Sequence, residues 1–67
     1  MTAVEARDKS IWRNIKGVIR KAITENIEDG LFSATIEERF MDMETLHSLQ
    51  LLGYKTFRDT HTYIIKW

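Results

Sequence analysis

The 67-residue sequence contains no cysteine, no proline and only three glycines. Without cysteine, the chain forms neither a disulfide framework nor a thiolate metal site. A domain of this length buries only about 60% of the surface that its unfolded chain exposes, so its core is thin. Because self-association is a common way to add buried apolar area, we expect a homo-oligomer.

The sequence also lacks a long hydrophobic run. No apolar stretch approaches the roughly 18 residues that span a bilayer. The opening residues, MTAVEARDKS, do not show the positive-then-apolar order of a secretory signal. With 43% hydrophobic residues and no proline, the composition argues against disorder. We therefore expect one soluble, cytoplasmic domain over residues 1–67, without a membrane partner.

Net charge is zero, but the charges are sorted along the chain. Residues 9–21 hold five cations and no acid, whereas residues 25–44 hold seven acids and one base. A polarised surface of this kind can steer an anionic ligand or pair one copy of the chain with another. Duplex nucleic acid is a disfavoured partner, because the net charge is zero rather than strongly positive and the acidic stretch would repel the phosphate backbone.

The first half of the chain predicts one long helix that ends at Gly30, a good residue to follow a helix C-terminus. Thr2 and Glu5 have the spacing of a capping box, so the helix can begin at Thr2. Ser10 is the alternative start, in which case residues 1–9 are frayed. Gly17 lies inside this predicted helix at a cost of about 1 kcal/mol relative to alanine. The apolar positions recur at helical spacing: Ile11, Ile15, Val18, Ile19, Ala22, Ile23 and Ile27.

The second half predicts three strands and a second helix. Residues 31–37 alternate between an apolar and a mixed face, as a strand does. Asp42 is a suitable N-cap for a helix that runs to about residue 52, where Gly53 stops it. Residues 54–58 and 62–67 form two further strands, and the short polar connection between them predicts an antiparallel hairpin.

These elements predict an α+β fold in the order α-β-α-β-β. The simplest arrangement is a three-stranded sheet with two helices on one face, and with the first strand beside the third. Two short helices cannot cover all of Leu31, Tyr54, Tyr63 and Trp67. We therefore expect the second sheet face or an edge strand to form an interface.

No catalytic or metal-binding pattern is present. The only two histidines, His47 and His61, lie at no ligand spacing from each other or from a pair of acids. There is no glycine-rich phosphate loop and no nucleophile elbow. The sequence therefore predicts a protein that is not an enzyme, with no catalytic residue, no metal and no cofactor.

The cations and aromatic residues are suited to binding an anion. Arginine and lysine supply charge and hydrogen-bond donors, and aromatic rings supply flat surfaces on which bases stack. The candidate ligand-binding residues are Arg13, Lys16, Arg20, Tyr54, Arg58, His61, Tyr63 and Trp67, and Lys55 and Lys66 add donors around the hairpin. In the first helix Lys9, Arg13, Lys16 and Arg20 are expected to share one face. The alternative is that the aromatic residues belong to the core or an interface and that the cations only keep the protein in solution.

Three segments carry a resemblance: residues 30–36 (GLFSATI), 51–55 (LLGYK) and 63–67 (YIIKW). In this order the chain resembles small phage-encoded accessory proteins over residues 15–67. The resemblance implies a non-enzymatic protein of the counter-defence type in the cytoplasm of an infected bacterial host. Such a protein would sequester a nucleotide-like immune signal as a homo-oligomer. Alternatively, it would inhibit or adapt a host protein through its exposed sheet or acidic segment.

Overall fold

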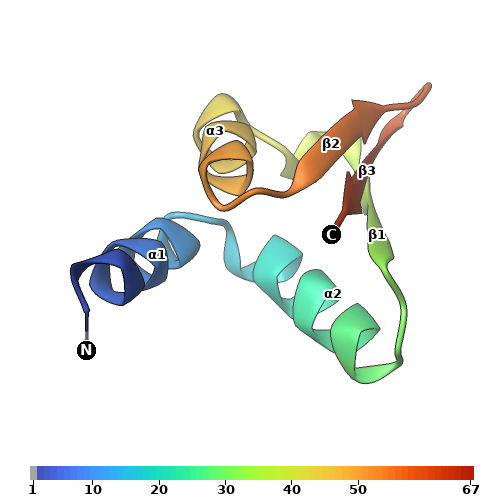
Figure 1. The fold of residues 1–67 in the computed structure, drawn as a ribbon. Helices are drawn as coiled ribbons and strands as arrows, with labels where there is room; N and C mark the ends of the chain where they lie inside the picture. The colour runs from blue at the N-terminus through green and yellow to red at the C-terminus, as the bar shows by residue number, and fades with distance from the viewer. Residues whose placement is uncertain (1) are drawn as a thin grey trace.

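The computed structural model describes residues 2–67, which form a small α+β fold of three helices and a three-stranded antiparallel sheet (Figure 1). The predicted class is confirmed, and the order matches apart from one additional helix. A short 3-10 turn (η1) follows the first strand. The elements are α1 (Ala3–Arg13), α2 (Gly17–Glu28), β1 (Ser33–Glu37), η1 (Glu38–Phe40), α3 (Met43–Leu51), β2 (Lys55–Arg58) and β3 (Thr62–Lys66).

The prediction of one continuous N-terminal helix was wrong. Asn14 caps the end of α1, Lys16 precedes the first residue of α2, and the chain turns between them (Figure 1). Ile15 lies in this junction and is only 1% exposed. Burial of its side chain offsets the helical hydrogen bonds that the break removes. Gly17 is therefore the first residue of a helix rather than an interior one.

Both predicted N-terminal caps are present. The Thr2 side chain accepts a hydrogen bond from the Glu5 N–H at 3.2 Å, so the helix begins there and not at Ser10. The Asp42 carboxylate accepts one from the Thr45 N–H at 2.7 Å and begins α3. Each cap satisfies a backbone donor that has no partner within the helix.

Gly30 ends α2 and Gly53 ends α3, as predicted. Gly30 has a φ of +77° and Gly53 a φ of +91°, in the left-handed region where side chains with a Cβ are strained. Gly53 turns the chain from α3 into β2, and the Tyr54 N–H donates back to the Leu49 carbonyl at 3.0 Å.

The strand order in the sheet is β1-β3-β2, and both neighbouring pairs are antiparallel. The predicted hairpin and the placement of the first strand beside the third are thus confirmed. The first strand was predicted over residues 31–37, but β1 begins only at Ser33, so Leu31 and Phe32 lie before it. Since β1 and β2 both run antiparallel to β3, they are parallel to each other, and α3 makes the crossover between them.

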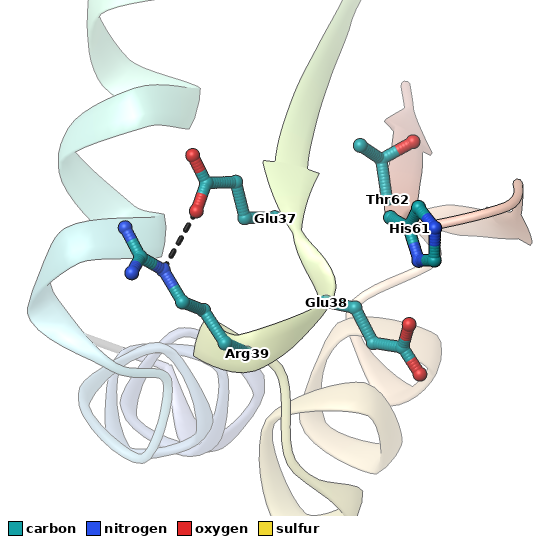
Figure 2. A pocket seen from close by; sticks show the side chains of 5 residues that line it. All are labelled: Glu37, Glu38, Arg39, His61 and Thr62. Atoms are coloured by element: carbon teal, nitrogen blue, oxygen red, sulfur yellow. Dashed lines mark ion pairs between the residues drawn. The ribbon is translucent and has the colours of Figure 1, made fainter.

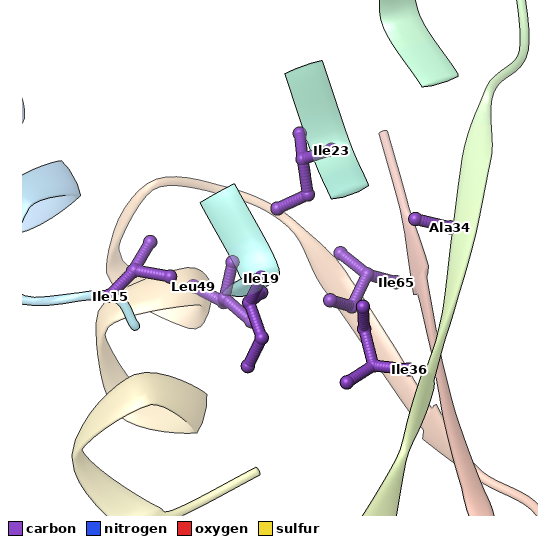
Figure 3. Packing of buried hydrophobic residues seen from close by; sticks show 7 residues of the cluster. All are labelled: Ile15, Ile19, Ile23, Ala34, Ile36, Leu49 and Ile65. Carbon is purple, nitrogen blue, oxygen red and sulfur yellow. The ribbon is translucent and has the colours of Figure 1, made fainter. Parts of the chain in front are cut away.

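The core includes side chains from one face of the sheet, which we call the inner face. Strand residues Ala34, Ile36 and Ile65 point from this face toward the helices (Figure 3). They pack with Ile15 of the helix junction, Ile19 and Ile23 of α2, and Leu49 of α3, all at most 5% exposed.

Tyr54, Tyr63 and Trp67 lie on the inner side of the sheet, whereas Phe57 of β2 lies on the opposite face. Tyr63 and Trp67 alternate with Ile64 along β3 and its extension, so they share the side of Ile65. Tyr54 is half-buried against the core. Leu31 is 51% exposed and Trp67 36% exposed, so the helices leave part of this predicted set uncovered, although the three aromatic residues do not lie on the second face.

Within residues 2–67, no helix has both the length and the apolar character needed to cross a lipid bilayer.

Candidate functional site

The sheet face opposite the core, which we call the outer face, is arranged in three rows across the strands. One end row holds Ser33, Lys66 and Lys55, the middle row Thr35, Ile64 and Phe57, and the other end row Glu37 and Thr62. All eight side chains are exposed or half-buried, and Phe57 is 49% exposed. The outer face is therefore cationic at one end and acidic at the other.

Lys55 and Lys66 stand directly opposite each other on adjacent strands. The Asp59 N–H donates to the Thr62 carbonyl at 2.8 Å, and alternation along the ladder makes Lys55 and Lys66 a hydrogen-bonded pair. In such a pair the Cα atoms are about 5.5 Å apart. The backbone thus places the Cα atoms of two lysines side by side on the same face.

Neither lysine has an acidic partner. The ion pairs found within residues 2–67 join Lys16 to Asp42, Lys21 to Glu25, Arg39 to Glu37 and Arg58 to Glu38. Like charges directly opposite on two strands are destabilising. The Lys66 Nζ atom lies 5.3 Å from the centre of the Phe57 ring, which moderates this cost but supplies no counter-ion.

The two lysines line a hollow of about 270 Å³ together with Gly53 and Trp67. Gly53 presents no side chain there, and the space around its Cα is open. Trp67 is 36% exposed, so part of its indole faces solvent. We call this group of four residues the lysine hollow.

Tyr54 holds the indole of Trp67 in place. The two rings meet edge to face with their centres 6.2 Å apart, and Tyr54 in turn stacks on Trp12 at 6.5 Å. Burial raises the pKa of the Tyr54 hydroxyl above its ordinary value of 10.0, so this group is neutral at physiological pH. These contacts hold the Trp67 indole toward the inner side of the sheet, and the Tyr54 hydroxyl adds no negative charge there.

A second hollow, of about 480 Å³, lies at the other end of the sheet, lined by Glu37, Glu38, Arg39, His61 and Thr62 (Figure 2). The Arg39 Nε atom is 2.6 Å from the Glu37 carboxylate. The Glu38 carboxylate is 2.6 Å from the Arg58 guanidinium. Because each arginine already has a carboxylate partner, this hollow is poorly suited to an anion.

Residues 2–67 contain no group of three or more histidine, aspartate or glutamate side chains placed to hold a metal ion.

The eight candidate residues predicted from the sequence do not form one site. Tyr54 and Trp67 lie at the lysine hollow. Arg58, His61 and Tyr63 lie at the opposite end of the hairpin, three to five residues from Lys55 or Lys66 along the chain, or about 10–17 Å away. The remaining three, Arg13, Lys16 and Arg20, lie on the helices and their junction.

The predicted cationic helix face was also wrong. The break at residues 14–16 separates Lys9 and Arg13 from Lys16 and Arg20. Lys16 binds Asp42 at 3.3 Å, and Arg20 is half-buried. The cations with the most favourable geometry are instead Lys55 and Lys66, which the sequence marked only as additional donors. Their juxtaposition depends on the hairpin register, which places residues 55 and 66 opposite each other.

Comparison of the chain with protein-family models, curated proteins and solved structures finds no match to any of them.

Proposed function

We propose that this protein is a non-enzymatic binding protein that takes up an anionic, nucleotide-like small molecule at the lysine hollow. One observation carries the proposal: within residues 2–67, two opposed lysines have no acidic side chain as a partner and line one hollow together with Trp67, which is 36% exposed. The lysines would bind phosphate oxygens, and Trp67 would stack on a base. In the setting that the resemblance to phage accessory proteins implies, the ligand is an immune signal that the protein sequesters in the bacterial cytoplasm.

The proposal takes α2 and α3 to cover the inner face together, so that the lysine row stays free for the ligand. Bringing a phosphate between Lys55 and Lys66 removes their mutual repulsion as well as adding two charge-assisted hydrogen bonds. Each such bond contributes about 1.5–3 kcal/mol, so loss of one lysine should weaken binding about tenfold or more. Because both lysines are exposed, added salt should also weaken binding.

Thermal-shift screening tests the proposal with cyclic dinucleotides, cyclic trinucleotides and ADP-ribose derivatives as probes. A ligand that binds the folded state raises the melting temperature. The double variant Lys55→Gln/Lys66→Gln should lose this shift. The matched control Lys9→Gln/Lys21→Gln removes the same net charge from the helices and should keep it. If no probe in large excess moves the transition, the proposal is wrong.

Two further measurements sharpen the test. The variant Trp12→Phe leaves Trp67 as the only tryptophan, so stacking of a base should quench its fluorescence. Mass spectrometry of the released ligand should recover it unchanged, since a binding protein does not turn it over. Recovery of a cleaved product would refute the non-enzymatic part of the proposal.

A second function is favoured by the middle row of the outer face. Phe57 is 49% exposed beside the half-buried Ile64, and such a patch suits an inhibitor or adaptor that docks on a host protein. In that case a stoichiometric partner is captured from a bacterial lysate, and Phe57→Ser abolishes the capture whereas Val18→Ser, at a similarly exposed helix position, does not. Capture that survives Phe57→Ser would exclude this surface.

A further inference from the structure

Strand β1 has a free edge. The Trp67 N–H donates to the Phe32 carbonyl at 3.1 Å and the Glu38 N–H to the His61 carbonyl at 2.9 Å. Even-numbered residues of this segment therefore pair with β3 and its extensions, and Ser33, Thr35 and Glu37 direct their backbone groups away from β3. The Asn26 amide, which binds the Ser33 carbonyl at 2.9 Å, confirms this direction.

The outward groups of Thr35 and Glu37 have no protein partner. Within residues 2–67, no backbone or side-chain hydrogen bond reaches the N–H or C=O of either residue from outside the β1–β3 ladder. An edge with unpaired donors and acceptors is a template on which another strand can pair.

The two edges of the sheet differ in how they resist such pairing. Strand β2 spans four residues, Lys55–Arg58, and has a cation at each end, which is a common protection of an edge. Strand β1 (SATIE) has no cation, no proline and an unbroken register of five residue pairs with β3. Its central residues Thr35 and Ile36 are β-branched and favour extended backbone. Strand β1 is therefore the edge that admits a further strand.

We propose that β1 pairs with β1 of a second copy of the chain, antiparallel and with a two-fold axis at Thr35. The outward groups at residues 33, 35 and 37 are evenly spaced about Thr35, so an antiparallel copy presents donors opposite acceptors. The Ser33 carbonyl, which already accepts from Asn26, would accept this second hydrogen bond with its other lone pair. In this register Ser33 lies opposite Glu37 of the second copy, and its hydroxyl donates to that carboxylate. The contact is isologous and closes as a dimer with one six-stranded sheet.

This pairing leaves the lysine hollow free. The residues that line the hollow belong to β2, to β3 and to the positions next to them, and none belongs to β1. Strand β3 separates β1 from β2 in the sheet (Figure 1). Dimer formation and ligand binding are therefore separate properties, and failure of one leaves the other standing.

Cysteine cross-linking tests the register directly. The sequence contains no cysteine, so one introduced cysteine forms disulfides only between molecules. In a hydrogen-bonded pair at the two-fold axis the Cα atoms are about 5.5 Å apart, within the range that a disulfide spans. Thr35→Cys should form a linked dimer of twice the 7.9 kDa chain mass under mild oxidation. The matched variant Thr24→Cys, an exposed position on α2, should link only slowly.

Proline substitution tests the backbone pairing without a cross-link. Thr35→Pro removes an N–H that faces outward, so the β1–β3 ladder keeps its bonds while the dimer loses its central pair. Thr56→Pro removes an outward N–H from the other edge and serves as the control. Sedimentation should show a concentration-dependent dimer for the wild type and Thr56→Pro, and a monomer for Thr35→Pro, with circular dichroism verifying the fold of both variants. A wild type that stays monomeric at every concentration, or Thr35→Cys that links no faster than Thr24→Cys, overturns the inference.

Discussion

Replacement of Asp42 should separate two contributions to stability at the start of α3. Oδ1 of its carboxylate caps the helix through the Thr45 N–H at 2.7 Å, and Oδ2 lies 3.3 Å from the Lys16 ammonium. Asp42→Ala removes both contacts. Asp42→Asn keeps a capping oxygen and removes only the charge.

The cap should account for most of the loss. A lost N-cap costs about 0.5–2 kcal/mol. The Lys16–Asp42 pair is more than 40% exposed on both sides, so it contributes between about 0 and 1 kcal/mol. We expect Asp42→Ala to lower the free energy of unfolding by about 1–2 kcal/mol and Asp42→Asn by a few tenths. Because a chain of this length has a small unfolding entropy, 1 kcal/mol corresponds to about 7 °C in melting temperature.

The effect should also depend on pH in a defined direction. The Thr45 N–H, and to a smaller extent Lys16, lower the pKa of Asp42 below its ordinary value of 3.8. A lowered pKa in the folded state adds stability above the unfolded-state pKa, and this stability is lost as the pH falls through the folded-state value. The difference between wild type and Asp42→Asn should therefore be constant above about pH 5 and shrink below about pH 4.

The assay is thermal and urea unfolding of the three proteins from pH 2 to 7, followed by circular dichroism. Lys16→Met, which removes the ion pair and leaves the cap, is the control and should resemble Asp42→Asn. If Asp42→Asn loses as much stability as Asp42→Ala, the charge and not the cap dominates, and the reasoning is refuted.

Four further predictions concern the core, two glycines and the Tyr54 hydroxyl. Leu49→Ala should cost about 2–5 kcal/mol, a large part of the roughly 3–10 kcal/mol expected for the whole chain, and urea unfolding that shows a cost below about 1 kcal/mol would contradict the packing described. Gly17→Ala should raise the free energy of unfolding by about 0.4–1 kcal/mol, because the position is helical and an added Cβ has room. Gly53→Ala should lower it by about 1–2 kcal/mol, because its φ is +91°, so thermal melts with the same sign for both glycines would exclude this account. The variant Tyr63→Phe leaves Tyr54 as the only tyrosine, so absorbance titration should give a midpoint above 10. The raised pKa of Tyr54 adds stability below the unfolded-state pKa, and this stability is lost as the pH rises through the folded-state pKa.

Local chemistry in the sequence predicted most of the element boundaries. Thr2 and Asp42 are N-caps, and Gly30 and Gly53 are stops, because each function depends on a side chain or a φ angle of that residue alone. The hairpin was predictable for the same reason, since residues 59–61 make a connection too short for any other pairing.

The helix break at residues 14–16 was not predictable from periodicity. Ile11, Ile15 and Ile19 keep helical spacing across the break, so the apolar pattern is the same for one helix and for two. Burial of Ile15 at the junction favours two helices over one, and this burial depends on where α3 and the sheet lie. Asn14 and Gly17 are the residues that could have indicated it, because asparagine and glycine are common at helix ends.

The residue types of the candidate site were predictable from the sequence, but the positions that come together were not. Cations and aromatic residues around the hairpin were recognised, yet the residues that come together are Lys55, Lys66 and Trp67. Which residues face each other is set by the register of β2 against β3. A shift of one residue would have put Lys55 opposite Ile65 or Trp67 and left no pair of lysines.

The strand order has a consequence for how the chain folds. Strand β3 lies in the middle of the sheet but follows β1 and β2 in the chain, so neither edge strand has a partner until β3 is in place. The β2–β3 hairpin closes a short loop, whereas the Ser33–Lys66 pair joins residues more than thirty positions apart. Since closing a longer loop costs more entropy, the hairpin should form first and the docking of β1 should limit the folding rate. Until that step is complete, the middle strand itself presents an unpaired edge, and during this interval the chain is most exposed to misassembly.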